Sequence, residues 1–221
     1  MSTKHSVFSP SSYSMWSKCP PSIFGNIQNP DAPPEPFNPH SALGTLAHEV
    51  GEVILRGGDV NKIVPAKELL EIGVKVDEEM LDYVSIYTNF VKSLKGTLHV
   101  ETRVNLEYIH PDFGGTADAI VVSEDGKHIH VVDLKYGTGV QVFADNNPQL
   151  MIYALGAIYT LGIVSFETIS VTIVQPRLDH LDTFTLTYDE LLKFEAEVIS
   201  SVRAAEIIID KGTAHDAVGL P

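Results

Sequence analysis

The chain has 221 residues, 44% hydrophobic and 20% charged, a composition typical of one large globular domain. Its formal net charge of −14, from 29 acidic and 15 basic residues, argues against a basic coat for non-specific nucleic-acid binding but leaves a local basic groove open. Cys19 is the single cysteine, which excludes an internal disulfide and a cysteine-ligated zinc or iron–sulfur site within one chain.

The first forty residues predict a short helix followed by a proline-rich loop. Residues 1–14 lack the apolar core of a secretory signal, and no apolar run could cross a bilayer, so we expect a cytoplasmic protein with no membrane partner. Serine caps favour a short helix after Ser9 or Ser11, with Pro10 in its first turn. Residues 26–40 contain five prolines, which predict a loop or an extended linker because proline disfavours helix.

Two amphipathic helices are predicted next, over residues 41–56 and 77–95, because apolar residues recur there at helical spacing. The apolar positions are Leu43, Leu46, Ala47, Val50, Val53 and Ile54 in the first helix, and Leu81, Val84, Val91 and Leu94 in the second. His48 lies at the edge of the first apolar stripe, where its side chain could reach a cleft. A lone histidine on a helix is nevertheless usually not a metal ligand.

The middle of the chain predicts three strands. Between residues 98 and 108 the even positions are mostly apolar and the odd ones polar, which is typical of a strand with one solvated or functional face. Residues 115–122 and 128–136 predict two more strands. The segment SEDGK joins them, and Asp-Gly in a short connection indicates a hairpin.

The last third predicts a helix, two strands and a final helix. Residues 147–162 predict the first of these helices, capped by Asn146 or Asn147 and with Pro148 in its first turn. The remaining elements are strands over 167–176 and 182–188 and a helix to about Asp210 that begins at a capping box of Thr187 and Glu190. This order predicts an α/β or α+β fold in which helices flank a mixed central sheet of about five strands.

Asp133 and Lys135 follow two valines at the end of a predicted buried strand, and alternation places them on the same face. Antiparallel pairing would bring Asp118 toward Asp133, given the right register. Two carboxylates at close range repel unless one is protonated or a cation lies between them, and a hard divalent cation such as magnesium is the natural partner. A lysine beside that metal suits hydrolysis of a phosphate ester. The alternative is a common surface salt bridge between Lys135 and an aspartate.

Taken in chain order, these motifs resemble the PD-(D/E)XK nuclease superfamily, in the RecB-like branch that includes phage exonucleases and CRISPR adaptation nucleases. The motifs are His48 in GTLAHEVGE, Asp118 in GGTADAI, Asp133-Leu134-Lys135, and Gln149 with Tyr153 in the pattern Gln-x-x-x-Tyr. The resemblance covers most of residues 9–177, including SPSSYSMWSKCP. It implies one nuclease domain over residues 1–221 with a restriction-endonuclease-like core, in which residues 1–40 are an N-terminal helix and a proline-rich loop.

The resemblance also implies a role for each matching residue. The implied ligands of Mg²⁺ or Mn²⁺ are His48, Asp118, Asp133 and the Leu134 carbonyl, with Lys135 as the catalytic lysine and Gln149 and Tyr153 lining the site. These last two would touch the DNA backbone or fix Lys135. Glu101 could bind a second metal, and Ser11 and Arg177 could contact DNA. Iron–sulfur members of the branch use four cysteines, so we expect no iron–sulfur cluster here.

Purely structural roles for several of these residues stay open. Gln149 and Tyr153 could be an ordinary helix pair, and Arg177 could be a surface charge. Tyr13 and Trp16 could stack on a DNA end, although a place in the core is favoured. Cys19 is expected to be buried.

The function that the resemblance implies is a metal-dependent deoxyribonuclease, favoured as a phage or prophage exonuclease in DNA recombination or repair. Its partners would be linear duplex or single-stranded DNA and a recombination or single-strand-binding protein, with a homo-oligomer left open. It would work in the cytoplasm of a bacterial cell or a phage-infected host. The alternatives are a nuclease-fold DNA- or protein-binding partner that does not cut, a DNA endonuclease, and a hydrolase of small phosphate esters.

Overall fold

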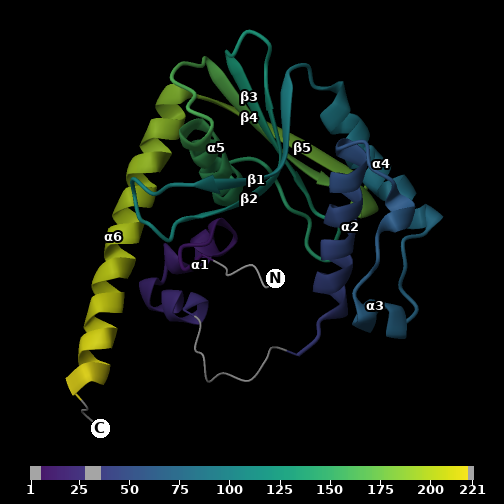
Figure 1. The fold of residues 1–221 in the computed structure, drawn as a ribbon. Helices are drawn as coiled ribbons and strands as arrows, with labels where there is room; N and C mark the ends of the chain where they lie inside the picture. Colours follow the sequence, from purple (N-terminus) through teal and green to yellow (C-terminus); the bar gives the residue numbers. More distant parts are fainter. Residues whose placement is uncertain (1–5, 28–35, 219–221) are drawn as a thin grey trace.

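The structure, a computed structural model, describes residues 6–27 and 36–218. Five strands form one central sheet flanked by helices (Figure 1). In sheet order the strands are β1 (Thr97–Asn105), β2 (Gly114–Val122), β3 (His128–Leu134), β4 (Thr168–Gln175) and β5 (His180–Thr187). β3 and β4 are parallel, and the other neighbours are antiparallel. The predicted α+β fold with a mixed sheet is therefore confirmed, and it is consistent with a restriction-endonuclease-like core.

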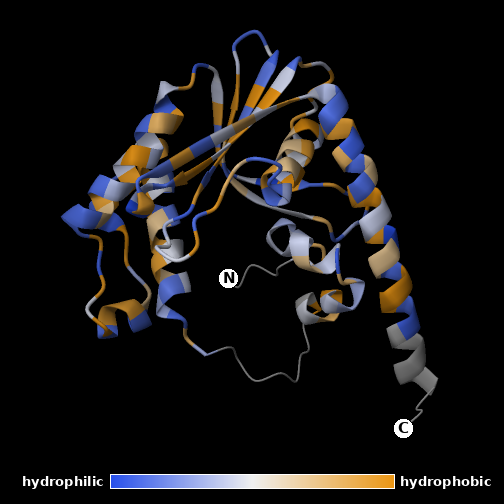
Figure 2. Ribbon diagram, turned by 180° about the vertical axis from the view of Figure 1, so that it is seen from behind, coloured by the Kyte–Doolittle hydropathy of each residue, from blue (hydrophilic) through white to orange (hydrophobic). Residues whose placement is uncertain are grey.

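The parallel pair determines where α5 (Pro148–Thr160) lies. Parallel strands need a crossover connection, and α5 supplies it between β3 and β4. The helix is buried from Leu150 to Ala157, and Figure 2 shows its ribbon as mainly hydrophobic. A helix that is apolar on all sides needs cover on all sides, and the long α6 (Tyr188–Val218) packs beside it.

Helices α2 (Pro39–Leu55) and α4 (Glu78–Ser93) pack together away from α6 (Figure 1). The short helices are α1 (Tyr13–Trp16), α3 (Lys67–Glu71), η1 (Pro10–Ser12), η2 (Pro20–Asn26), η3 (Val60–Lys62) and η4 (Pro176–Leu178). Two apolar clusters result, one shared by the sheet with α5 and α6 and the other with α2 and α4. Within the described residues, no helix has the length and apolarity needed to cross a membrane.

Several predicted signals have the expected geometry. Asn147 caps α5 by accepting a hydrogen bond from the amide of Leu150 (3.3 Å). Thr187 and Glu190 form the capping box, in which the Thr187 amide donates to the Glu190 carboxylate (2.8 Å). Tyr13 and Trp16 are buried, as expected.

Other predictions need correction. Cys19 is exposed rather than buried. Helix α2 begins at Pro39, inside the predicted loop, because the Asn38 side chain accepts hydrogen bonds from the first free amides of the helix. The last helix continues beyond Asp210 to Val218. Residues 28–35 of the predicted loop lie outside the described residues, and α3 was not predicted.

Strand β1 differs from the prediction of a single apolar face. Leu98 belongs to the cluster of α2 and α4, whereas Val104 belongs to the cluster of α5 and α6. Even positions of a regular strand point the same way, so the alternation must change between these two residues. Glu101 lies between them with a φ of 46°. A left-handed residue costs about 1–2 kcal/mol outside glycine, and this one lies in the stretch where the alternation changes.

Candidate metal centre

The sheet register brings the predicted acids together. β2 and β3 pair with Ala119 opposite Val132, so the next position along each strand places Asp118 beside Asp133. The register between β1 and β2 places Glu101 opposite Asp118 in the same way. Three acids therefore form a row across three neighbouring strands, and the approach of Asp118 to Asp133 follows the antiparallel pairing that the hairpin signal predicts.

Helix α2 adds an imidazole to this row. His48 Nδ1 lies 3.3 Å from Asp118 Oδ1 and 3.9 Å from Glu101 Oε1. One possible ligand atom from each of these three residues lies within 4.8 Å of the other two. We call His48, Glu101 and Asp118 the acid–histidine cluster. Asp118 Oδ2 accepts a hydrogen bond from the Leu134 amide (2.7 Å), which orients the carboxylate with Oδ1 toward His48.

The acid–histidine cluster fits a divalent cation by the chemistry of its donors. Carboxylate oxygens suit Mg²⁺ and Mn²⁺, and an imidazole nitrogen suits transition metals better than Mg²⁺. Burial by itself would lower the pKa of His48, but Asp118 and then Glu101 outweigh it and raise the pKa to about 10. Because a metal-binding histidine must be neutral, a cation and the imidazole proton would compete for the same carboxylates.

Lys135 lies beside the cluster in a chain of polar contacts. Its Nζ is 2.9 Å from Asp133 Oδ2 and donates a hydrogen bond to Gln149 Oε1 (3.3 Å). Gln149 Nε2 in turn donates to the Tyr153 hydroxyl (3.2 Å). The ion pair considered from the sequence is thus present, but Asp133 is only 2% exposed, so it is not a surface pair.

The environment of Lys135 keeps its ammonium charged. Burial would lower the pKa of Lys135, but the neighbouring charge of Asp133 more than offsets this and raises it. Burial acts in the opposite sense on the carboxyl group of Asp133, whose pKa it raises against the opposing effect of Lys135. A partly buried acid–base pair of this kind is costly to maintain and strongly destabilising to break.

The glycine-containing stretch before Asp118 has a packing role. A Cβ on Gly115 would lie 2.9 Å from Tyr153 Cε1, closer than real Cβ atoms approach, and 3.1 Å from Pro10 Cγ, which is a tight contact. The missing side chain therefore lets the ring of Tyr153 lie against β2. Burial is the largest influence on the Tyr153 hydroxyl and raises its pKa to about 12.

The remaining predicted residues have the following places. Among the described residues, the three-residue metal group does not include Asp133, whose Oδ2 faces Lys135. Leu134 contributes its amide, through the contact to Asp118, and its carbonyl as a ligand stays a prediction. Ser11 is exposed, with its hydroxyl 2.7 Å from that of Ser9. The Arg177 guanidinium lies 5.1 Å from the centre of the Tyr136 ring.

Sequence reasoning missed two features near the site. Tyr87 of α4 is buried, and burial followed by the charges of Asp118 and the other acids raises the pKa of its hydroxyl. Its position, three residues after Val84 on the apolar stripe, is the signal that could have identified it. The second feature is Gln175, which is 2% exposed and fixes the loop after Lys135.

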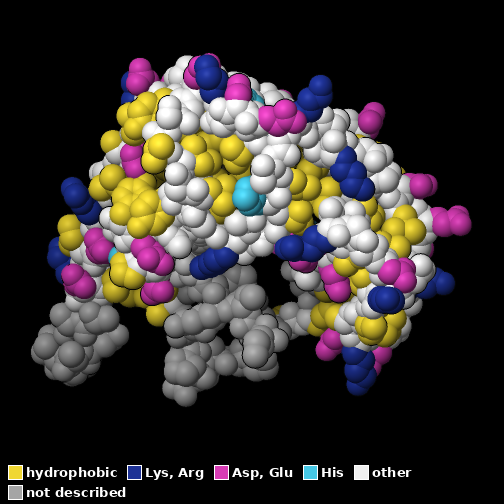
Figure 3. Space-filling model, turned by 45° about the horizontal axis from the view of Figure 1, so that its top comes forward, with side chains coloured by type: hydrophobic (Ala, Val, Ile, Leu, Met, Phe, Trp, Pro, Cys, Tyr) yellow, Lys and Arg dark blue, Asp and Glu magenta, His cyan; other side chains and the backbone are white. Residues whose placement is uncertain are grey.

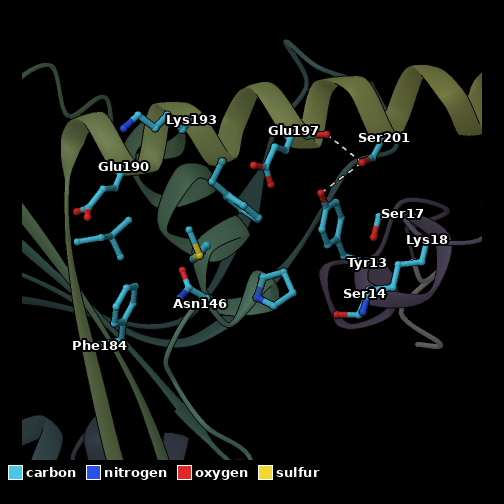
Figure 4. A pocket seen from close by; sticks show the side chains of 14 residues that line it. Tyr13, Ser14, Ser17, Lys18, Asn146, Phe184, Glu190, Lys193, Glu197 and Ser201 are labelled. Carbon is cyan, nitrogen blue, oxygen red and sulfur yellow. Dashed lines mark hydrogen bonds between the residues drawn. The ribbon is translucent and has the colours of Figure 1, made fainter.

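The contacts of Gln175 shape a groove beside the cluster. Its Nε2 donates to the carbonyls of Gly137 (3.1 Å) and Val140 (3.0 Å), and its Oε1 accepts from the Val142 amide (3.0 Å). The same loop and His48 line a groove of about 340 Å³. A larger cavity of about 630 Å³ lies between α1, α5 and α6, and no predicted metal ligand lines it (Figure 4).

These elements define an α+β protein with an acid–histidine cluster and a lysine held beside it. The chain belongs to the DUF2800 family, whose model matches residues 5–215 and is described as a protein of unknown function. Two solved structures are similar at low identity. The crystal structure of SSO0001 has 14% identity and a TM-score of 0.38, covering 91% of this chain and 72% of that one. The structure of LHK-Exo in complex with dAMP has 12% identity and a TM-score of 0.37, and the match covers 77% of this chain and 92% of that one. Likenesses at this level establish neither fold nor activity.

Proposed function

We propose that this protein is a metal-dependent deoxyribonuclease that hydrolyses phosphodiester bonds with Mn²⁺ or Mg²⁺. The observation that carries the proposal is the convergence of His48, Glu101 and Asp118 within 4.8 Å, next to a lysine paired with a buried aspartate. The motif order supplies DNA as the substrate, because it resembles that of PD-(D/E)XK nucleases. Composition alone would not suggest it.

The acid–histidine cluster would hold the cation, with Asp133 and the Leu134 carbonyl as the further ligands that the resemblance implies. A cation bound there would polarise the scissile phosphate and lower the pKa of an attacking water. Two of the proposed ligand side chains are already oriented, since the Leu134 amide holds the Asp118 carboxylate and helix α2 carries His48 beside it. Hydrogen bonds to the side chains that bind a metal determine how those side chains are oriented.

Lys135 would stabilise the negative charge that develops on the phosphate. Its raised pKa keeps the side chain protonated at neutral pH, which favours this role over removal of a proton from water. Gln149 accepts a hydrogen bond from the lysine and is held by Tyr153, so this pair would act by positioning Lys135.

We propose further that the enzyme is a cytoplasmic exonuclease of phage or prophage origin that serves recombination or repair on linear DNA. On the face shown in Figure 3, basic side chains stand singly among acidic ones, so contact with DNA across that face would be local. Arg177, stacked over the tyrosine that follows Lys135, is the proposed phosphate contact, and Ser11 is a second. A recombination or single-strand-binding protein and further copies of the chain are the proposed partners.

Cleavage of linear and covalently closed circular DNA, with Mn²⁺ or Mg²⁺, tests the proposal. We expect the wild type to degrade linear DNA and the Lys135→Ala variant to lose activity by about 100-fold or more, as on removal of a charge-stabilising group. Lys127→Ala removes an exposed lysine that pairs with Glu167 and should retain activity. Cutting of closed circles would indicate an endonuclease. Binding of DNA without cleavage would indicate a non-cutting partner, and activity that survives in Lys135→Ala would show that the site is placed wrongly.

A further inference from the structure

Glu101 has a backbone conformation that a regular strand does not provide. Its φ of 46° lies in the left-handed region, which is uncommon outside glycine. The regular pairing of β1 with β2 runs to Val100 and resumes at Thr102. Strained residues persist where the surrounding structure imposes them, and they gather at functional sites. Here the strained residue is also the only acid in β1.

Arg56, at the end of α2, makes a contact at this point. Its Nη2 donates a hydrogen bond to the Val100 carbonyl (2.8 Å), which belongs to the peptide bond that leads into Glu101. Its Nε donates to Glu52 Oε1 (2.8 Å). Because the guanidinium group is planar, the bond to Glu52 also fixes the direction of Nη2.

The two contacts tie the strand to the helix that carries His48. His48, Glu52 and Arg56 are four residues apart in succession, so they share one face of α2. The same helix face thus supplies one ligand of the acid–histidine cluster and a clamp on the backbone of another. Arg56 is exposed, and the buried residues of α2 lie elsewhere on the helix.

We propose that Arg56 is a positioning residue, which holds the β1 backbone so that the Glu101 carboxylate reaches the acid–histidine cluster. This inference rests on the proposed metal function and deepens it, because it names the residue that holds Glu101 where it can share one ion with His48 and Asp118. Arg56 itself touches neither the ion nor the substrate.

Two roles of Arg56 predict opposite effects on cation affinity. Its positive charge repels a cation, so loss of the charge alone would strengthen binding. Loss of the hydrogen bond to Val100 would release Glu101 and weaken binding, and outer-sphere substitutions of this kind typically cost 10–100-fold in metal affinity. The sign of the effect therefore distinguishes positioning from simple electrostatics.

The test measures Mn²⁺ affinity of the full chain by isothermal titration calorimetry. We expect Arg56→Ala to weaken binding by about tenfold or more. Arg56→Lys keeps the positive charge but loses the planar guanidinium group that reaches both Glu52 and Val100, and it should weaken binding less. Arg103→Ala removes an exposed arginine from the same strand and should leave binding unchanged or slightly tighter. Circular dichroism of each variant establishes folding, and Arg56→Lys carries the test should Arg56→Ala fail to fold.

A double-mutant comparison identifies the group through which Arg56 acts. Glu101→Gln should weaken Mn²⁺ binding, and Arg56→Ala should then add no further loss, as measured by Mn²⁺ electron paramagnetic resonance. A wild type that binds Mn²⁺ while the Arg56 variants bind equally or more tightly would overturn the positioning role and leave the metal site standing. An equal loss in the Glu101→Gln background would overturn it too. A wild type that binds no Mn²⁺ would overturn the proposed function and this inference together.

Discussion

Asp118 makes contacts with both oxygens, and each contact serves a different purpose. Oδ2 accepts the Leu134 amide and joins β2 to β3, whereas Oδ1 faces His48. The first contact is structural and survives in any side chain with an acceptor oxygen. The second depends on negative charge, since it is the largest influence that raises the pKa of His48. The two purposes can therefore be separated by one substitution.

The substitution Asp118→Asn should strongly weaken metal binding while leaving the fold intact. Its amide oxygen can still accept the Leu134 hydrogen bond, but the second atom becomes a neutral NH₂ donor that cannot bind a cation. We expect Mn²⁺ affinity to fall at least about 100-fold, at the upper end of the losses for changed metal surroundings, with little change in the circular dichroism spectrum. Calorimetric titration measures the affinity. Asp112→Asn, at an exposed aspartate, is the matched control, and an equal loss there would contradict the assignment.

At the scale of single residues, the motifs in the sequence name most of the side chains that the structure brings together around Asp118, but they do not give the arrangement. Asp118, Lys135 and Gln149 each fall in a short motif, so the sequence can single them out as candidates. The sequence predicts Glu101 only as a ligand for a second metal, because its place opposite Asp118 depends on strand register and on a left-handed residue. Arg56 carries no motif at all. Contacts between residues 44 positions apart, as between Arg56 and Val100, leave no periodic signal in a sequence.

At the scale of elements, a row of polar side chains crosses β3, β4 and β5 inside the sheet. His130 Nε2 lies 2.7 Å from Thr172 Oγ1, which lies 2.7 Å from Thr183 Oγ1. The ring of Phe90 packs edge-on against the imidazole. Burial first, and then the charge of His128, lowers the pKa of His130 to about 4. The row is thus built for a neutral imidazole.

This row predicts a loss of stability in mild acid. The pKa of His130 in the folded protein, about 4, lies below the usual value of about 6.5. The unfolded chain therefore binds more protons between these values, and the stabilisation is complete above pH 6.5 and is lost as the pH falls toward 4. The full effect is on the order of 3 kcal/mol. Urea unfolding at pH 7.5 and 4.5 measures it. His130→Gln, which keeps a hydrogen-bonding group, should show a smaller difference, and an identical one would exclude His130 as the cause.

The elements themselves were largely predictable, for a physical reason. Caps and turns such as Asn147 and the Thr187–Glu190 box act within a few residues, and their geometry follows from the local sequence. The start of α2 was missed because a helix first turn can include Pro39 and the cap is the asparagine before it. Burial of α5 on all sides depends on α6, which comes later in the chain, so length and composition could not show it.

At the scale of the whole molecule, the acid–histidine cluster joins segments that are far apart in the chain. His48 comes from α2, Glu101 from β1 and Asp118 from β2, and the helix and the two strands belong to different layers of the fold. The unfolded chain does not hold these groups together. A cation that needs all three groups must therefore bind the folded state in preference to the unfolded state.

Mn²⁺ should consequently raise the thermal stability of the protein. At a free concentration 100 times the dissociation constant, preferential binding contributes about 2.7 kcal/mol, which for a chain of this size raises the Tm by about 5–10 °C. Differential scanning calorimetry with and without Mn²⁺ measures the shift, and a chelator should reverse it. Asp118→Asn should reduce the shift to at most about 1–2 °C, because its affinity is weaker by at least about 100-fold, and Asp112→Asn should preserve it. A shift of equal size in Asp118→Asn would mean that the ion stabilises the protein by binding elsewhere. If the ion binds the acid–histidine cluster, the loss of one carboxylate, that of Asp118, must lower both the metal affinity and the stability that Mn²⁺ adds.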